Sequence, residues 1–581
     1  MTNNQITSLW STLIIEELVR HGIRRFCISP GSRSTPLTAA AARHPETVCK
    51  IFPDERAAAF FALGYARGTR KPAVLICTSG TAVANYFPAV VEASLDNQPM
   101  LVLSADRPFE LLETGANQTI RQSGIFGGYT RWDIELPEPS EDTPARALLS
   151  TIDHAVQRSL GSLPGPVHLN LPFREPFDPV DIPSDNTWVQ ALEPWRKKRE
   201  PLNSFTINRA ETDRAAVIQT KKILENASCP LLVAGQLDTP ADAEAILGLS
   251  KKLKAPLYAD IASQLRMHSE NEPLQPLLLS ERFTSFFKPD AVLHFGGKLV
   301  GKQLAAAIKN WAPEHFIVIK SHPARYNPDH NVTLRIESSP GSFASLLASE
   351  TSRAQGNNLP INTVSFELES ELDGYCSPGN SPTEISAARI VSGTIPENHG
   401  LFLANSMPIR DMDAYAVVRK DRAALRCGVN RGASGIDGNI ATAAGFAQGL
   451  GKPVTLLIGD LSFLHDLNSL TLLRRLEHPL HIVVINNNGG GIFSFLPIAQ
   501  QKDIFETHFG TPQDYDIRSA AETFGIPYIK PSTNGDFREC YAESCRSTVS
   551  GIIEITGSRD ENVTEHRRLN AKLREIIDRH L

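Results

Sequence analysis

Residues 453–460 read PVTLLIGD, and residues 481–491 read HIVVINNNGGG. In both stretches a run of aliphatic residues ends in glycine or polar residues, which is typical of a buried parallel strand followed by a loop. The interval between Asp460 and Asn487 has room for one crossover helix, over residues 461–476. We therefore expect two neighbouring parallel strands that carry Asp460 and Asn487 at their carboxyl ends, where ligands bind in such sheets.

The same pattern recurs along the chain, where helix-like amphipathic segments separate short apolar runs. A parallel sheet covered by helices on both faces requires this alternation. The sequence therefore predicts an α/β protein with three doubly wound, mostly parallel sheets. The other expected strands are Arg25–Ser29, Ala73–Cys77, Met100–Ser104, Val167–Leu171, Leu231–Ala234, Ala291–Phe295, Phe316–Ile319 and Ile552–Ile555.

Two stretches are typical of connections between domains. Arg174–Asp213 is rich in proline, and Ser352–Thr383 is rich in glycine, proline and asparagine. Cutting the chain there predicts domains at residues 1–190, 191–360 and 361–581, each of an ordinary domain size.

The amino-acid composition excludes several classes of protein. The 581 residues include 58 basic and 64 acidic side chains, and the net charge of −6 argues against a dedicated nucleic-acid binder. No apolar run approaches the roughly 20 residues of a membrane span, and Glu16 and Glu17 stand where a signal peptide would be apolar. The 8 cysteines include no C-x-x-C pair, which favours reduced thiols over disulfides or a zinc site. We expect a cytoplasmic protein without nucleic-acid partner or membrane insertion.

The polar residues after the two strands that open this section could hold a metal ion. The Asp460 carboxylate, the Asn487 amide oxygen and the Gly489 carbonyl are hard oxygen donors, which suit Mg²⁺ or Mn²⁺ with phosphate oxygens in the remaining positions. An alternative interpretation is that Asp460 caps the next helix and that the Asn/Gly run is a tight turn.

The spacing of Gly459-Asp460 and Asn486-Asn487 resembles the diphosphate and metal motif of the thiamine-diphosphate-dependent enzymes, although Leu461 stands where most members have a second glycine. The resemblance implies a glutamate on a separate domain that binds the pyrimidine ring of the cofactor, and Glu55 in FPDERAAAF (residues 52–60) matches it. It also implies that Ile436 supports the bent cofactor. The implied cofactor contacts are Glu55, Ser79, Gly80, Ile436, Gly459, Asp460, Leu461, Asn487 and Ile492.

Further motifs narrow the resemblance. They read CISPGSRSTP (27–36), CTSGT (77–81), SADRP (104–108), GANQ (115–118), NSMPIRD (405–411) and RGASGIDG (431–438). In this order they resemble the 2-succinyl-5-enolpyruvyl-6-hydroxy-3-cyclohexene-1-carboxylate synthases of menaquinone and phylloquinone biosynthesis. That family decarboxylates 2-oxoglutarate and adds the resulting succinic semialdehyde carbanion to isochorismate. The resemblance also implies a homodimer or dimer of dimers, because the cofactor of these enzymes usually bridges two subunits.

Both implied substrates are polyanions, so the site must present several cations, and arginine orients a carboxylate through two parallel hydrogen bonds. By similarity, the substrate-binding residues are Ser32, Arg33, Arg107, Lys302, Ser406, Arg410, Arg431 and Phe493. The residues that the resemblance places at the reacting centre are Glu55, Arg33, Asn117, Gln118, Arg410 and Arg431.

Two other functions stay open at this stage. The chain could be another thiamine-diphosphate 2-oxo acid decarboxylase or carboligase, similar to acetolactate synthase. It could also bind a nucleotide, because residues 296–302 satisfy the phosphate-loop pattern G-x-x-x-x-G-K. Gln303, however, stands where that loop needs Ser or Thr to hold Mg²⁺.

Overall fold

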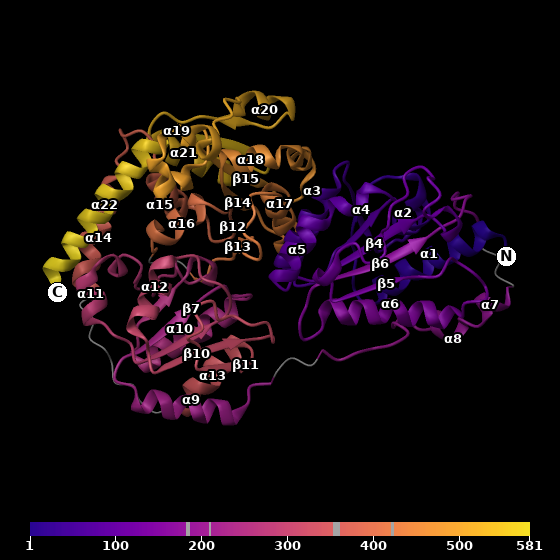
Figure 1. The fold of residues 1–581 in the computed structure, drawn as a ribbon, viewed down its shortest axis with the longest axis horizontal. Coiled ribbons are helices and arrows are strands. Elements are labelled where there is room, and N and C mark those ends of the chain that lie inside the picture. Colours follow the sequence, from indigo (N-terminus) through magenta and orange to yellow (C-terminus); the bar gives the residue numbers. More distant parts are fainter. Residues whose placement is uncertain (182–185, 208–210, 352–360, 420–422) are drawn as a thin grey trace. The chain divides into compact units, whose positions relative to one another are not determined.

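The computed structural model describes residues 1–181, 186–207, 211–351, 361–419 and 423–581. Within this part of the chain three wholly parallel sheets form, which confirms the predicted α/β class. The chain divides into two compact units, coloured by sequence in Figure 1. The first unit is Met1–Asn208 with Asn430–Gly451, and the second is Arg209–Val429 with Lys452–Leu581.

The sheet of the first unit has the order β2-β1-β3-β4-β6-β5. Helices α1 (Asn3–Arg20) and α6 (Ala145–Leu160) join one apolar cluster with strand residues such as Ile76 and Leu103. Helix α3 (Glu55–Thr69) packs on β1, β3 and β4. The strands are β1 (Arg25–Ile28), β2 (Val48–Ile51), β3 (Val74–Cys77), β4 (Met100–Asp106), β5 (Trp132–Glu135) and β6 (Pro166–Pro172).

Helix α17 (Asn439–Leu450), although it comes late in the chain, packs against α3 in the first unit. The contact is close, because a Cβ atom at Gly445 would lie 2.0 Å from the carbonyl oxygen of Phe61. Only glycine permits this approach of two backbones. The packing therefore joins the helix that Glu55 begins to a segment some 380 residues further along the chain.

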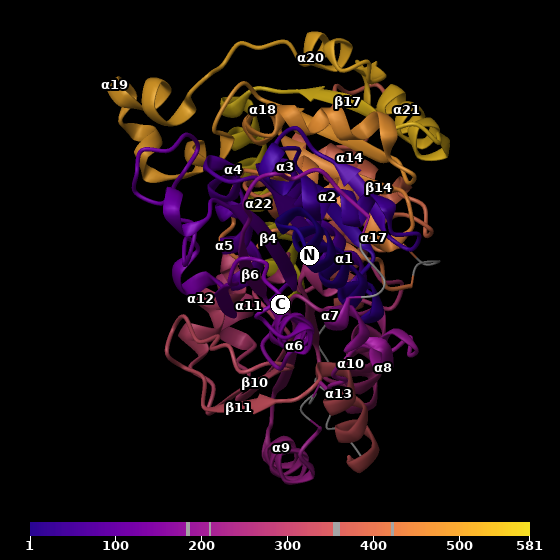
Figure 2. The ribbon, with the colours of Figure 1, turned by 90° about the vertical axis from the view of Figure 1, so that its right-hand side faces the viewer.

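The second unit contains two sheets, with the orders β11-β10-β9-β7-β8 and β13-β12-β14-β15-β17-β16. One apolar cluster includes residues of both sheets, for example Val292 and Leu457. Figure 2 shows β10 and β11 of the first of these sheets and β14 and β17 of the second. The strands are β7 (Pro230–Ala234), β8 (Leu257–Ala259), β9 (Ala291–Phe295), β10 (His315–Lys320), β11 (Leu334–Glu337), β12 (Gly400–Leu403), β13 (Cys427–Val429), β14 (Val454–Gly459), β15 (Leu480–Asn486), β16 (Tyr528–Ile529) and β17 (Gly551–Thr556).

The remaining helices cover and connect these sheets. None of the helices in the described ranges is both long and apolar enough to cross a membrane. They are α2 (Thr35–Arg43), α4 (Thr81–Asn85), α5 (Phe87–Leu95), α7 (Thr187–Gln190), α8 (Glu193–Arg196), α9 (Arg214–Asn226), α10 (Pro240–Leu253), α11 (Glu281–Phe286), α12 (Lys302–Trp311), α13 (Pro340–Glu350), α14 (Ile361–Gly374), α15 (Glu384–Thr394), α16 (Met407–Tyr415), α18 (Asp460–His465), α19 (Lys502–Phe505), α20 (Ile517–Thr523), α21 (Asn534–Arg546) and α22 (Arg559–His580).

Every strand expected from the sequence is present, and β14 and β15 are neighbours in which Gly459 pairs with Ile485. The prediction of a single crossover helix over residues 461–476 is wrong. The structure has α18 followed by a 3-10 helix, Leu467–Arg475. Ser469 donates its hydroxyl to Asp466 Oδ1 at 2.7 Å and its N–H to Asp466 O at 3.0 Å, and such local bonds compete with the α-helical pattern.

The expected connection Ser352–Thr383 contains a helix that the sequence analysis did not predict, α14. This helix packs against α22, beside which it lies in Figure 1. The first part of that expected connection, residues 352–360, lies outside the described residues.

Candidate active site

Asp460 lies at the carboxyl end of β14, as the first residue of α18, and only 3% of it is exposed. Its Oδ1 accepts the N–H of Leu461 at 2.8 Å, and its Oδ2 accepts the N–H of Gly489 at 2.8 Å. The Tyr515 hydroxyl donates to the Asp460 carbonyl oxygen at 2.8 Å. The carboxylate therefore ties the loop after β15 to the end of β14.

Gly489 gives this loop its shape. Its φ of +143° is a backbone conformation that other residues rarely adopt. A Cβ atom there would also lie 2.0 Å from the carbonyl oxygen of Gly510. The glycine is therefore required by conformation and by space.

The donor set at this sheet edge fits a divalent cation. Burial raises the pKa of Asp460 to about 6, because the buried carboxylate loses the water that would stabilise its negative charge. A positive ion bound next to the carboxylate would stabilise that charge. Asn487 Oδ1 is buried, and among the described residues no donor reaches it. A buried amide oxygen without a partner, two residues before the Gly489 that Asp460 binds, is what a hard metal ion would satisfy.

Glu384, the first residue of α15, is a neighbour of this site that the sequence analysis missed. Asn487 Nδ2 donates to Glu384 Oε1 at 2.8 Å. Burial, followed by the charge of Asp411, raises the pKa of Glu384 to about 8. An acid in the first turn of a helix is common, so no signal in the sequence separated Glu384 from an ordinary helix-terminal acid.

His566 on α22 belongs to the same acidic surroundings. Its Nε2 lies 2.9 Å from Asp411 Oδ1 and its Nδ1 lies 2.8 Å from the carbonyl oxygen of Asn562. Both partners only accept, so the ring donates from both nitrogens as an imidazolium. Burial opposes this charge, but the charge and hydrogen bond of Asp411 raise the pKa of His566 to about 8.

Ser79, Arg107, Asn117 and Gln118 come together in the first unit. Arg107 donates to Ser79 Oγ at 3.0 Å and to the Asn117 carbonyl oxygen at 2.9 Å. Gln118 Nε2 donates to the Ser79 carbonyl oxygen at 2.9 Å, with Gln118 held at a φ of +56°. Non-glycine residues seldom adopt this conformation, and when they do it is often at a functional site.

Gly80 is held by Gln122, another residue that the sequence analysis missed. The Gly80 N–H donates to Gln122 Oε1 at 2.8 Å. Gln122 Nε2 in turn donates to Asn170 Oδ1 at 3.0 Å and to the Ala105 carbonyl oxygen at 3.1 Å. The Ser79–Gly80 turn is thereby fixed to the end of β4.

Arg33 is buried next to the segment that follows β6. It donates to the Phe173 carbonyl oxygen at 2.5 Å, and its NH2 lies 3.4 Å from Glu175 Oε1. Burial, and secondly the charge of Arg107, lower the pKa of Arg33. Ser32, next to it, is exposed.

Glu55 begins α3 and is half-buried, after Asp54, whose side chain accepts the N–H of Ala57 at 3.3 Å. Glu55, the predicted pyrimidine contact, therefore lies at a well-capped helix start. An acidic residue in the first turn is itself favourable there.

The loop that carries Arg431 and Ile436 is attached to Glu92 of α5 in the first unit. Glu92 accepts the N–H of Gly432 at 2.7 Å and the N–H of Ala433 at 2.5 Å, and it pairs with Arg67 at 3.0 Å. Ile436 is 40% exposed, so an apolar surface remains for the predicted contact with a cofactor.

In the second unit, Ser406 precedes α16 with a φ of +76°, and Arg410 on that helix donates to the Ser406 carbonyl oxygen. Ile492 and Phe493 lie in the 3-10 helix Gly491–Phe495, where Phe493 packs edge-on against Phe509. Lys302 is exposed at the start of α12.

The predicted site residues are shared between the two units. The first unit holds Ser32, Arg33, Glu55, Ser79, Gly80, Arg107, Asn117, Gln118, Arg431 and Ile436, and the second holds Lys302, Ser406, Arg410, Gly459, Asp460, Leu461, Asn487, Gly489, Ile492 and Phe493. Their joint action on one cofactor stays a prediction.

Three N–H groups of the G-x-x-x-x-G-K loop after β9 donate to other parts of the protein. Gly296 donates to the Ile319 carbonyl oxygen at 2.9 Å, Gly297 to that of Gln236 at 2.8 Å, and Val300 to Asp260 Oδ2 at 2.6 Å. A phosphate loop binds through such N–H groups. Those three groups are therefore already used, which disfavours a nucleotide site at this loop.

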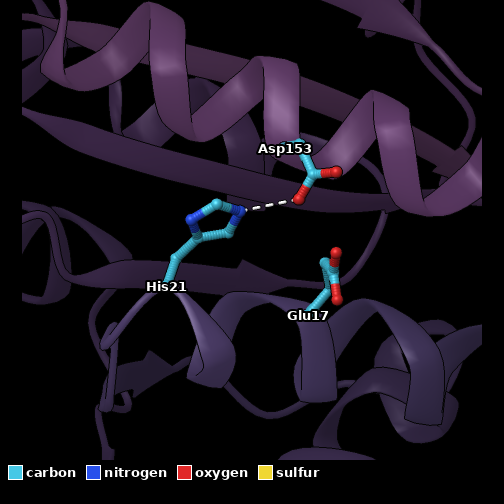
Figure 3. A group of neighbouring side chains, drawn as sticks. All are labelled: Glu17, His21 and Asp153. Carbon is cyan, nitrogen blue, oxygen red and sulfur yellow. Dashed lines mark hydrogen bonds and ion pairs between the residues drawn. The ribbon is translucent and has the colours of Figure 1, made fainter. Parts of the chain in front are cut away.

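Figure 3 shows a second group of metal-ligand types, in which the His21 ring points at Asp153 and Glu17 lies beside them. The carboxylate oxygens already bind other groups of the chain. Glu17 accepts from Trp195 Nε1 at 2.8 Å and from the N–H of Leu202 at 2.5 Å. Asp153 binds His21 at 2.6 Å and the N–H of Asn203 at 2.9 Å. The group fastens the segment after β6 to α1 and α6, so we do not interpret it as a metal site.

Three sequence models of the thiamine pyrophosphate enzymes match the chain: the N-terminal TPP binding domain at residues 10–125, the middle domain at 186–403 and the C-terminal TPP binding domain at 412–555. The crystal structure of benzoylformate decarboxylase from Polynucleobacter necessarius has the same fold, with a TM-score of 0.70 at 16% identity over 95% of this chain and 98% of that one. Together with the parallel sheets and the Asp460–Asn487 edge, these matches define the class as thiamine pyrophosphate enzymes.

Closer relatives narrow this class. The chain is 69% identical over 581 residues to a protein of Chlorobium phaeobacteroides named 2-succinyl-5-enolpyruvyl-6-hydroxy-3-cyclohexene-1-carboxylate synthase, with 100% of both chains covered. It is 58% identical to the protein of that name from Prosthecochloris aestuarii, over 100% of this chain and 99% of the relative. The chain belongs to this synthase family.

Proposed function

We propose that the chain converts 2-oxoglutarate and isochorismate into 2-succinyl-5-enolpyruvyl-6-hydroxy-3-cyclohexene-1-carboxylate and CO₂, a step toward menaquinone or phylloquinone. The observation that carries the proposal is the identity of 69% to a relative named for this product. The buried oxygen donors of Asp460 and Asn487 support it independently of that name.

Asp460, Asn487 and the Gly489 carbonyl would hold Mg²⁺, or Mn²⁺, against the diphosphate of the cofactor. Gly459, Leu461 and Ile492 would line the diphosphate side of the cofactor. Glu55 would bind the pyrimidine ring, with Ser79, Gly80 and Ile436 around it. When bound, thiamine diphosphate supplies the nucleophilic carbon and accepts the electron pair that decarboxylation leaves behind.

The arginines would orient the substrate carboxylates through paired hydrogen bonds and would stabilise negative charge as the new carbon–carbon bond forms. We assign Arg33, Arg107, Arg410, Arg431 and Lys302 to this role. Ser32 and Ser406 would contribute hydroxyl groups, Asn117 and Gln118 would contribute amides near the reacting centre, and Phe493 would contribute an apolar wall that excludes water.

We also propose an assembly and a compartment. The proposed domains are the pyrimidine-binding domain at residues 1–190, a middle domain at 191–360 and the diphosphate- and metal-binding domain at 361–581. The proposed assembly is a cytoplasmic homodimer or dimer of dimers, in which the N-terminal domain of one subunit and the C-terminal domain of its partner complete each site.

The test is a turnover assay with purified protein, Mg²⁺, thiamine diphosphate and 2-oxoglutarate, with and without isochorismate. We expect isochorismate absorbance to fall only in the complete mixture. Consumption of 2-oxoglutarate at an equal rate without isochorismate, with isochorismate unchanged, would instead support a simple 2-oxo acid decarboxylase.

A further inference from the structure

Three consecutive asparagines stand at the carboxyl end of β15, Asn486 as its last residue and Asn487 and Asn488 directly after it. Each donates a hydrogen bond from its side-chain nitrogen to an acidic side chain of another segment. The three distances are equal, so the distance alone does not distinguish the asparagines. Asn486 donates to Glu554 Oε1, Asn487 to Glu384 Oε1 and Asn488 to Asp514 Oδ1, each at 2.8 Å.

The side-chain oxygens of the three asparagines differ. Asn486 Oδ1 accepts the N–H of Asn488 at 3.2 Å. Asn488 Oδ1 accepts the N–H of Gln513 at 3.2 Å and that of Asp514 at 3.3 Å. Asn487 Oδ1 is buried and accepts nothing from the part of the chain that the structure describes. Only this oxygen of the three is thus left for a ligand.

We propose that Glu384 is a positioning residue that makes Asn487 present its oxygen, and not its NH₂ group, to the metal ion. The inference rests on the metal site of the proposed function. A side-chain amide can turn over, and an NH₂ group cannot bind a cation. Because Glu384 Oε1 accepts a hydrogen bond from Asn487 Nδ2, the NH₂ group faces Glu384 and Oδ1 faces the other way.

Glu384 is suited to this role because it is buried and held by its own helix. It is 6% exposed, and the start of α15 is fixed by a capping box between Thr383 and Ser386. Partners that orient a metal ligand in this way typically change metal affinity by about 10- to 100-fold when they are removed.

The experiment titrates Mg²⁺ into the apo-protein at saturating thiamine diphosphate and measures the Kd of Mg²⁺ by calorimetry. We expect Glu384→Ala to weaken Mg²⁺ binding by about 10- to 100-fold. Glu384→Gln keeps an acceptor oxygen and should stay within about threefold of the unchanged protein. The Tm of each metal-free variant is measured in parallel. If Glu384 served only the fold, Glu384→Gln would not restore the Mg²⁺ affinity without also restoring the Tm.

Asp514→Ala is the matched control, because it removes the same kind of bond from Asn488, and we expect its Mg²⁺ affinity to be unchanged. Glu384→Leu keeps the volume without an acceptor and replaces Glu384→Ala if that variant does not fold. Normal Mg²⁺ affinity in a folded Glu384→Ala or Glu384→Leu variant overturns the proposal. A loss of Mg²⁺ affinity in Asp514→Ala equal to the loss in the Glu384 variant overturns it as well. If Asp460→Asn and Asn487→Ala weaken binding in that case, only the role of Glu384 falls, whereas normal binding in both removes the metal site itself.

Discussion

Arg410 and Arg431 are the residues at which the proposed substrates are most directly tested. We expect Arg410→Ala and Arg431→Ala each to lower kcat/KM at least tenfold, about 1.4 kcal/mol of transition-state stabilisation, because a substrate carboxylate loses its paired donors. Replacement by lysine keeps the charge but not the paired geometry, so we expect it to restore activity only in part. Steady-state kinetics with both substrates measure the effect, and unchanged kcat/KM in both alanine variants would remove the substrate assignment.

His566 makes stability depend on pH. Its pKa is raised from 6.5 to about 8 in the folded protein, so its contribution is fully present below pH 6.5 and is lost as the pH rises through about 8. The shift corresponds to about 2 kcal/mol. His566→Gln should therefore lower the Tm of the apo-protein by several degrees near pH 6 and by much less near pH 9. Calorimetric scans across this range test it, and a Tm difference that does not change with pH would contradict it.

At the scale of elements, the contact between α3 and α17 brings two helix backbones so close that only glycine fits. An added Cβ atom at Gly445 would lie 2.0 Å from the Phe61 carbonyl oxygen, so Gly445→Ala must push the helices apart and should cost about 1–3 kcal/mol. Gly248 in α10 is the control, because a Cβ atom added there would have no neighbouring atom within 4 Å. At that position alanine should be neutral or stabilise by up to about 1 kcal/mol. Tm measurements on both variants compare them, and equal effects would contradict the prediction.

The strands that the sequence predicted are continuous aliphatic runs, because β4, β14 and β15 are buried on both faces and their composition shows it. Most of the strands that it missed lie at sheet edges, and β12, a buried strand of four residues inside its sheet, is an exception that this reason does not cover. The edge strand β2, for example, is partly exposed and has no apolar run, and β16 has two residues. Edge strands are stabilised by their neighbours more than by their own composition, so periodicity alone does not find them.

The residues of the candidate site also include some that the sequence predicted and some that it did not. The positions of Asp460 and Asn487 were predictable, because each residue directly follows a strand that is recognisable from its aliphatic run, and the two strands are parallel neighbours. The partners Glu384, Gln122 and Glu92 were not, because each comes from a distant element and looks locally like an ordinary helix or loop residue. Their roles depend on tertiary contacts that no local pattern encodes.

For the whole molecule, the decisive question is whether one chain or two complete a site. Glu55 belongs to the first unit and Asp460 to the second, and the proposed dimer brings them together across a subunit boundary. Glu55→Gln and Asp460→Asn should each abolish activity alone. If sites span subunits, half of randomly mixed dimers carry one variant of each kind, and one of their two sites contains neither change, so co-expression should restore about a quarter of the normal activity. Two affinity tags isolate the mixed dimers, which should have about half the normal activity. Complete inactivity of folded, cofactor-saturated mixed dimers would show that each chain builds its site alone.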